Sequence, residues 1–304
     1  MARFLARKER RNPLIVIVGP TASGKSDLAV KLARKFHGEI ISADSRQVYK
    51  GLDIGSGKIT RKEMMSIPHH LLDVTSPRHR FTVAQYQRLA LKAIHQIHRK
   101  GKLPILVGGS PFYIYSVVYG IAIPEVKPDF ELRKRLEKLS VDNLYKKLKQ
   151  LDPERAKTIE AKNPRRLIRA LEIVIKTNKP VPPLKKQPLP HSILMLGIKR
   201  SPEELKKPIR KRLLDRLDHG MINEVRSLKK SGLSWKRLES FGLEYRFVAQ
   251  YLQGKISRSE MLNQIQKSSE DFARRQMTWF KKDSRIHWVK DQKEAKGLVT
   301  SFLK

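Results

Sequence analysis

The segment from Gly19 to Ser26 reads Gly-Pro-Thr-Ala-Ser-Gly-Lys-Ser and matches the pattern G-x-x-x-x-G-K-[ST]. In this pattern, backbone N–H groups of the loop and of the following helix surround phosphate oxygens, the lysine adds positive charge, and the last hydroxyl can bind Mg²⁺. The pattern therefore predicts a diphosphate site with Ser26 as the metal ligand. Its expected members are Gly19, Thr21, Ala22, Ser23, Gly24, Lys25 and Ser26.

Two other polar residues follow short apolar runs. Asp44 comes after residues 39–43, and Ser110 comes after residues 104–107 and two glycines. Proteins that cleave a nucleoside triphosphate usually carry an Asp where the second of these runs ends, because that Asp helps to hold Mg²⁺. Its absence here favours a loop that holds a leaving diphosphate. Asp44 is a candidate general base, with a helix cap as the alternative.

Apolar segments that alternate with helical patterns place these residues in space. Residues 13–18, 39–43, 104–107, 192–198 and 286–289 have the apolar, β-branched character of buried parallel strands. Parallel strands joined by right-handed crossovers bring ligands to their carboxyl ends. We therefore expect an α/β fold with a P-loop parallel-sheet core, helices on both faces and a largely helical insertion domain.

Two charged regions with helical periodicity extend this core. They cover residues 127–178 and residues 202 to about 269. The predicted organisation is a basic N-terminal arm at 1–11 and a P-loop core at 12–200 together with 270–304. The core carries the helical addition at 127–178. Residues 201–269 form a helical insertion that we expect to contact the binding partner of the protein. Trp279 and Phe280 fall in an apolar helical pattern that favours the core.

The charge of the chain points to a polyanionic partner. The 304 residues include 65 Lys and Arg against 29 Asp and Glu, a formal net charge of +36. Such an excess attracts nucleic acid, with an anionic membrane as a weaker possibility and a general lysine-rich bias as the alternative explanation.

Other compositional features bear on the redox environment of the protein and on membrane contact. The chain contains no Cys, which excludes disulfides and thiolate metal sites and favours a reducing cytoplasm. No apolar run approaches the ~18 residues that span a bilayer, so we expect no membrane partner. We expect the protein to be a monomer.

Several motifs, taken in order, resemble the tRNA dimethylallyltransferase (tRNA isopentenyltransferase) family of the bacterial type. The resemblance covers nearly the whole chain. The segments that carry it are Gly19–Ser26, Ala43–Tyr49 with Asp53–Gly55, Pro68–Asp73, Gly108–Ser110, Arg166–Glu172, Gly242–Arg246 and Arg274–Phe280.

The resemblance implies a reaction and roles for individual residues. Members of this family transfer a dimethylallyl group from dimethylallyl diphosphate to N6 of the adenosine adjacent to the anticodon, position 37 of the tRNA, with Mg²⁺. By resemblance, Asp44 is the base, Lys25 binds diphosphate, and Ser110, where the family usually has Thr, positions a reactant. Nearby arginines would stabilise the charge that builds on the leaving diphosphate. The candidates are Arg166, Arg169, Arg212 and Arg216, of which we expect Arg212 to bind diphosphate, with solvation at the surface as the alternative. The residues that fall where the family contacts tRNA are Asp44, Ser45, Arg46, Gln47, Arg165, Arg166, Leu167, Ile168, Arg169, Gly242, Arg246, Arg274, Arg275, Gln276 and Lys281.

Other functions remain open at this point. One alternative is another P-loop transferase, either a small-molecule kinase or an adenylate prenyltransferase that acts on free AMP, ADP or ATP. The net charge and the helical additions argue against it, because a small nucleotide needs neither. A second alternative is an RNA-binding protein with a vestigial loop, which the joint presence of the loop, Asp44 and Ser110 disfavours.

Overall fold

The computed structural model describes residues 12–124, 126–183, 185–187 and 190–304. The expected basic arm at 1–11 lies outside these residues. Within them, one compact unit contains residues 12–119 and 190–304, and a second contains residues 120–187.

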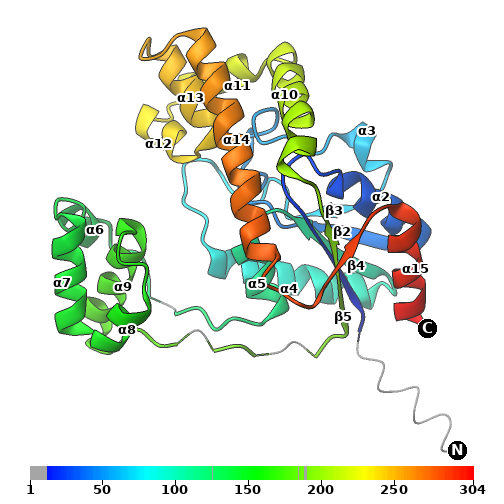
Figure 1. Cartoon of the computed structure of the whole chain (residues 1–304), viewed down its shortest axis with the longest axis horizontal. Coiled ribbons are helices and arrows are strands. Elements are labelled where there is room, and N and C mark those ends of the chain that lie inside the picture. Colours follow the sequence, from blue (N-terminus) through cyan, green and yellow to red (C-terminus); the bar gives the residue numbers. More distant parts are fainter. Residues whose placement is uncertain (1–11, 125, 184, 188–189) are drawn as a thin grey trace, which may run out of the picture. The chain divides into compact units, whose positions relative to one another are not determined.

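A parallel sheet forms the centre of the first unit (Figure 1). Its strand order is β3-β2-β4-β1-β5-β6, and every pairing is parallel. The strands are β1 (Leu14–Val18), β2 (Gly38–Ser42), β3 (His69–His70), β4 (Leu103–Gly108), β5 (Ile193–Ile198) and β6 (Ile286–Val289). The five predicted strands are therefore present, and β3 is an additional edge strand of two polar residues.

Helices cover both faces of this sheet. On one face, α2 (Lys25–Lys35) and α15 (Gln292–Leu303) bury residues such as Leu32 and Val299 against the strands. On the other face lie α4 (Val83–Arg99) and α5 (Pro111–Val118). The central strands are therefore covered on both faces, which explains why β1, β4 and β5 contain no polar side chain. The predicted fold class is confirmed.

A group of helices lies at the carboxyl ends of the strands (Figure 1). The two longest, α10 and α14, pack along each other. The α14 helix runs without a break through residue 269, so the expected boundary of the insertion falls inside a continuous helix. The helices are α3 (Arg61–Met64), α10 (Pro202–Asp218), α11 (Met221–Lys230), α12 (Trp235–Ser240), α13 (Leu243–Leu252) and α14 (Arg258–Phe280).

The second unit is helical and has its own core. Leu136, Leu148, Leu167 and Leu171 are all buried together there. The helices are α6 (Phe130–Leu136), α7 (Val141–Leu151), α8 (Pro153–Thr158) and α9 (Pro164–Thr177). This unit contains the helical addition expected at 127–178. That residues 201–269 contact the partner stays a prediction. Among the described residues of the whole chain, none belongs to a helix long and apolar enough to cross a bilayer.

Candidate active site

The phosphate loop connects β1 to α2 and has the backbone geometry that an anion site needs. Ala22 and Gly24 both have positive φ angles, 61° and 85°. Gly24 is the N-cap of α2 and makes no side-chain cap hydrogen bond, so the first N–H groups of the helix are available to a ligand. The Ser23 hydroxyl is buried, and we find no partner for it among the described residues.

Lys25 points its ammonium group into this loop. Its Nζ donates to the Pro20 carbonyl oxygen at 3.1 Å. Burial and, to a smaller extent, the nearby charge of Arg212 lower the pKa of Lys25 to about 8, while Asp44 acts in the opposite direction. An anionic ligand would favour the protonated form, so the site is electrostatically prepared for phosphate.

Two arginines of α10 complete the cationic wall. Arg212 and Arg216 line a cavity of about 80 Å³ together with Lys25 and Ser26. Burial lowers the pKa of Arg212, and the charge of Arg216 lowers it further. The backbone at Gly57 passes so close that a Cβ there would lie 2.0 Å from Arg216 Nη2. Arg216 is paired with Glu244 at 2.6 Å, whereas Lys25 and Arg212 make no ion pair among the described residues. These two neighbouring cations fit a site whose ligand carries negative charge.

Asp44 follows β2 and faces this cavity. Its Oδ1 accepts the backbone N–H groups of Arg46 at 2.8 Å and Gln47 at 3.3 Å. These two bonds fix the direction of the carboxylate. For Oδ2 we find no hydrogen bond from the described residues, which leaves this oxygen open to a substrate.

Ser110 follows β4 and lies beside Asp44. Its Oγ accepts the backbone N–H of Ser45 at 3.1 Å, and its own N–H donates to the Ala43 carbonyl at 3.2 Å. The strands approach so closely here that a Cβ at Gly108 would lie 2.2 Å from the Ala43 oxygen. Glycine is therefore required before Ser110.

A second cavity, of about 270 Å³, adjoins the first. Thr21, Asp44, Ser56 and Arg216 line both, so the two cavities meet at these residues. The second cavity is walled by α13 and α14, and its other lining residues are Ser45, Arg46, Ser110, Phe241, Gly242, Leu243, Glu244, Tyr245, Arg246, Phe247, Ser268, Phe272 and Arg275. The arrangement can place a phosphorylated ligand on one side of Asp44 and a second reactant on the other.

The α14 residues that we expected to contact tRNA point in three directions. Arg275 lines the second cavity. Arg274 and Lys281 line a separate groove on the opposite side of the helix. Gln276 is 2% exposed, and both ends of its amide bind protein groups. Of these four residues, one lines the second cavity, two line the separate groove, and Gln276 is buried inside the protein.

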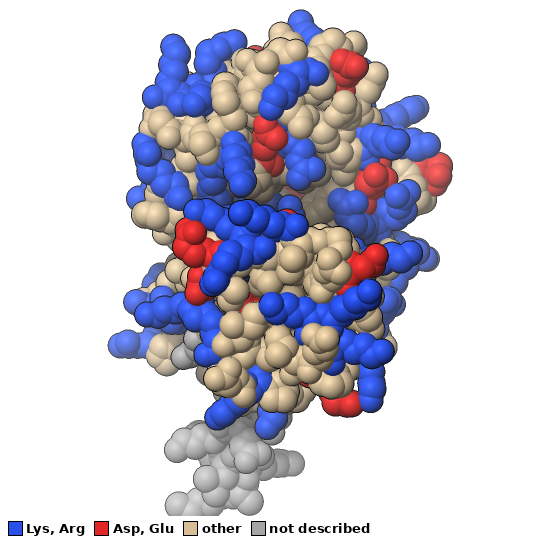
Figure 2. Space-filling view, turned by 90° about the vertical axis from the view of Figure 1, so that its left-hand side faces the viewer, with Lys and Arg blue, Asp and Glu red and all other residues tan. Residues whose placement is uncertain are grey.

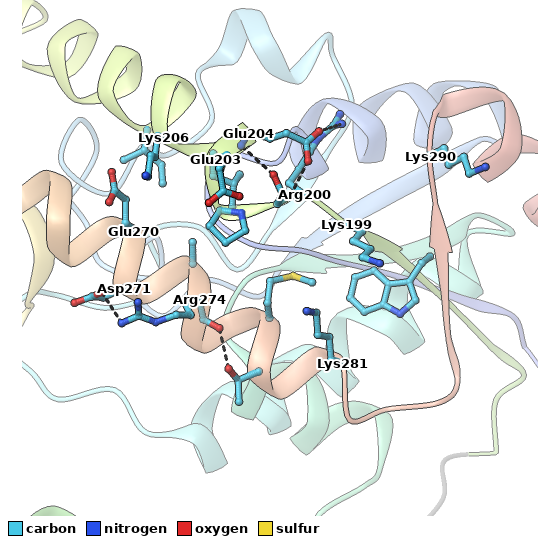
Figure 3. A pocket seen from close by; sticks show the side chains of 18 of the residues that line it. Lys199, Arg200, Glu203, Glu204, Lys206, Glu270, Asp271, Arg274, Lys281 and Lys290 are labelled. Atoms are coloured by element: carbon cyan, nitrogen blue, oxygen red, sulfur yellow. Dashed lines mark hydrogen bonds and ion pairs between the residues drawn. The ribbon is translucent and has the colours of Figure 1, made fainter.

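The groove of about 1000 Å³ lies between α10, α14 and the ends of β5 and β6 (Figure 3). Within it, Arg200 pairs with Glu204 at 3.3 Å and Arg274 pairs with Asp271 at 2.8 Å. Four lysines that line it make no ion pair among the described residues: Lys199, Lys206, Lys281 and Lys290. The groove therefore offers free positive charge beside an apolar floor that includes Met277.

The expected tRNA-contacting residues at 165–169 all lie in α9 of the second unit. Leu167 and Ile168 are buried in its core, so their side chains stabilise the unit. Arg169 is held by Glu172 and by the Val126 carbonyl. Arg165 and Arg166 are exposed and free to approach a partner, although Arg166 also lies 3.2 Å from Glu160.

The loop that begins with Asp53–Gly55, one of the motifs in the sequence, is held in place by a carboxylate of α11. The Glu224 carboxylate accepts the backbone N–H groups of Asp53, Ile54 and Gly55 at 2.6 to 3.0 Å, as well as the hydroxyl of Tyr245 at 2.8 Å. This carboxylate fixes the loop beside the arginines of α10. Gly55 and Gly57 allow Tyr245 and Arg216 to approach the backbone of this loop closely. No pattern in the sequence identified Glu224 as the residue that binds it.

The two histidines of β3 have protein partners. His70 Nε2 lies 2.7 Å from Glu39, and His69 Nδ1 lies 2.8 Å from the Ile67 carbonyl. Burial lowers the pKa of His69, which lines the smaller cavity. Within the part of the chain that the structure describes, no group of three or more His, Asp or Glu residues could hold a metal ion by itself.

Comparisons with known proteins were made for the whole chain. The family model described as IPP transferase matches residues 47–283. The tRNA dimethylallyltransferase of Acetivibrio thermocellus is 38% identical over 300 residues, covering 96% of each chain. The tRNA dimethylallyltransferase 1 of Geotalea daltonii is 42% identical over 281 residues, covering 91% of this chain and 90% of that protein.

Solved structures give the same result. The tRNA isopentenylpyrophosphate transferase from Bacillus halodurans superimposes with a TM-score of 0.72 at 34% identity and covers 96% of this chain and 97% of its own. A eukaryotic dimethylallyltransferase acting on tRNA has a TM-score of 0.73 at 28% identity, with 88% of this chain and 69% of that chain covered.

Proposed function

This chain belongs to the tRNA dimethylallyltransferase family, and we propose that it transfers the dimethylallyl group of dimethylallyl diphosphate to N6 of the adenosine next to the anticodon of a tRNA. The observation that carries this proposal is the meeting of two cavities at Asp44. One has the charge of a diphosphate site, and the other is large enough for a base.

The smaller cavity is proposed to hold the donor. Lys25, Arg212 and the N–H groups at the start of α2 would surround the diphosphate. As the bond between the allylic carbon and oxygen breaks, its electron pair stays with the diphosphate, whose charge grows. Cations and N–H groups that are already in place stabilise that growing charge without reorganising.

The larger cavity is proposed to hold the adenine after it leaves its stack in the RNA loop. The N6 lone pair forms the new bond to the allylic carbon, and the N6 proton passes to the Asp44 carboxylate. A base is needed because the exocyclic amine is a weak nucleophile. The bonds from Arg46 and Gln47 to Oδ1 hold Asp44 in position for this transfer.

A divalent metal ion accompanies prenyl transfer in this family, and we propose Mg²⁺. The donor set fits it in one respect, since Ser26 supplies a hydroxyl beside the diphosphate cavity. Mg²⁺ commonly keeps several waters and takes substrate phosphates as ligands, so it does not require a cluster of carboxylates. Bound there, it would neutralise diphosphate charge.

The tRNA is proposed to bind through its phosphates as well as through its loop. Among the charged side chains visible in Figure 2, Lys and Arg are far more frequent than Asp and Glu. Of the groove lysines without an ion pair among the described residues, Lys206 lies on α10, which also carries Arg216, and Lys281 is the C-cap of α14, which carries Arg275. We further propose that the protein works as a cytoplasmic monomer.

A competition between acceptors tests this function. Purified protein is given radiolabelled dimethylallyl diphosphate and Mg²⁺ with an unmodified tRNA, with AMP, or with both. We expect label in the tRNA and none in AMP. Label that accumulates in AMP would favour the adenylate prenyltransferase, whereas rapid ATP hydrolysis without prenyl transfer would favour a kinase-like enzyme.

A further inference from the structure

The buried side chain of Gln276 joins two loops of the candidate active site. Its Oε1 accepts the backbone N–H of Thr21 at 2.8 Å, and its Nε2 donates to the Gly109 carbonyl at 2.6 Å. Thr21 belongs to the phosphate loop after β1, and Gly109 directly precedes Ser110 after β4. A single side chain thus connects the wall that holds the donor to the wall that carries Ser110.

An amide is the side chain that these two groups require. It offers one acceptor and one donor at the same end, which matches one free N–H and one free carbonyl. The fit is close, since a Cβ at Gly109 would lie 2.2 Å from Nε2 of Gln276. The glycine before Ser110 therefore makes room for the amide. The bond to the Gly109 carbonyl is buried, where water cannot readily replace it, and the bond from Thr21 is partly buried.

The helix that carries Gln276 also faces the acceptor. Ser268, Phe272 and Arg275 of α14 line the larger cavity, so one rigid helix contacts both loops and forms part of the proposed adenine site. Thr21 itself lines both cavities. The position of α14 consequently determines how far the phosphate loop stands from Ser110.

We propose that Gln276 is a positioning residue for prenyl transfer, which fixes the spacing between the phosphate loop and the Ser110 loop so that donor and acceptor meet in reactive geometry. This inference rests on the function proposed above. Gln276 lines neither of the two cavities, so it acts through Thr21 and Gly109. Misplacement of reacting groups by about 1 Å can cost on the order of 10²-fold in rate.

Two substitutions separate this role from a general effect on folding. Gln276→Glu keeps the length and the acceptor for Thr21 but loses the donor to Gly109. Gln276→Met keeps the approximate shape and loses both bonds. Gln266→Met is the matched control, because it makes the same change on the same helix outside the residues that line the two cavities.

The measurements are the single-turnover rate at saturating tRNA and dimethylallyl diphosphate, and the affinity for tRNA, at a temperature where each variant is folded. Both Gln276 variants should transfer prenyl about 10- to 100-fold more slowly, with tRNA affinity changed less than about threefold, while Gln266→Met keeps the wild-type rate. Variants that are folded and transfer at the wild-type rate overturn the inference. If the wild type itself transfers no prenyl group to tRNA, the proposed function fails first.

Hydrogen exchange gives an independent test that needs no catalysis. In the wild type, the Thr21 amide should be protected; in the variants, peptides that contain Thr21 should exchange faster while those within α2 do not. A Thr21 amide that exchanges in the wild type as fast as in an unstructured peptide would contradict the inference, even if neither variant folds.

Discussion

Lys25 combines burial, proximity to Arg212 and a place in the phosphate loop. Burial brings its pKa down to about 8, so its charge is held weakly until an anion arrives. The ammonium therefore acts mainly on charge that the ligand brings and that increases as the diphosphate leaves. It contributes to the reaction more than to the stability of the empty protein.

Replacing Lys25 by Ala should raise the KM for dimethylallyl diphosphate and lower turnover by about 10²–10³-fold. The folded-state pKa lies below the usual value of 10.5, so the ammonium is lost as pH rises through about 8. In the wild type, kcat/KM for the donor should fall over that range, and this decline should be missing from the variant.

Lys31→Ala, on an exposed position of the same helix, is the control and should leave both parameters unchanged. A Lys25→Ala enzyme with wild-type kinetics and an unchanged high-pH decline would show that the loop does not bind the donor through this lysine.

Single residues also mark what the sequence can and cannot predict. The phosphate loop could be predicted from the sequence because the residues that form it are eight consecutive positions of the chain. Gln276 was predicted to contact tRNA because it falls in a segment where the resembling family does so, whereas its two hydrogen-bond partners are 255 and 167 residues away in the chain. Trp279 and Phe280 were both expected in the core, but Trp279 is 44% exposed while Phe280 is buried.

At the scale of elements, the carboxyl ends of the strands carry the candidate active site, and the amino end of β2 carries a cluster of charged residues. Glu39, near the amino end of β2, is 1% exposed and lies within 2.7 to 3.1 Å of His70, Lys100 and Lys102. Burial by itself would raise the pKa of this carboxyl. Hydrogen bonds from Lys102, His70 and Lys100 outweigh burial and bring the pKa to about 2. The cluster therefore joins β2, β3 and β4 at the end away from Asp44.

The lowered pKa of Glu39 predicts a pH-dependent stability. A carboxyl with a folded-state pKa near 2 and an ordinary value of 4.5 stabilises the fold above about pH 4.5, and this contribution is lost as the pH falls toward 2. Because both lysines are about half exposed, we expect roughly 1–3 kcal/mol at neutral pH.

Glu39→Gln should lower the unfolding temperature at pH 7 and weaken the loss of stability between pH 4.5 and 2, without changing kcat. Thermal melts across that pH range measure this, with the exposed Glu203→Gln as control. A variant with the stability profile of the wild type would mean that the cluster contributes nothing to folding.

Helices and strands were predictable where their own residues carry the pattern. The five buried strands were predicted from their runs of mostly apolar residues, and all five are present. The sixth, β3, has only two histidines and forms by pairing with β2, so no local pattern could reveal it. The predicted end of the insertion at residue 269 lies within α14, which continues from Arg258 to Phe280, and helical periodicity alone does not mark a domain boundary inside a continuous helix.

At the scale of the whole molecule, the net charge of +36 is the dominant property. On α10, the arginines at 212 and 216 face the cavity, whereas Lys206, Lys207 and Lys211 are exposed. Each phosphate that such a lysine neutralises releases counterions, so the affinity for tRNA should fall with salt. Six to ten contacts would cost roughly 10³–10⁵ in affinity between 50 and 200 mM salt.

Replacing Lys206, Lys207 and Lys211 together by Gln should weaken all tRNAs alike and reduce the salt slope by up to about three units. Filter binding over a salt series measures the slope. The control removes three charges elsewhere, at Lys293, Lys296 and Lys304 on or after α15, and should keep the wild-type slope. If the first variant keeps it too, the tRNA docks on another surface.

The central claim is that prenyl transfer takes place at Asp44, where the two cavities meet. Asp44→Asn preserves the size of the side chain and its oxygen toward Arg46 and Gln47, but the amide cannot accept the N6 proton. The decisive measurement is the single-turnover rate of dimethylallyl transfer to tRNA, taken with the tRNA dissociation constant of the same variant. We predict a rate lower by about 10²–10⁴ and a dissociation constant within about twofold of the wild type. A variant that transfers the group at nearly the wild-type rate would contradict the account.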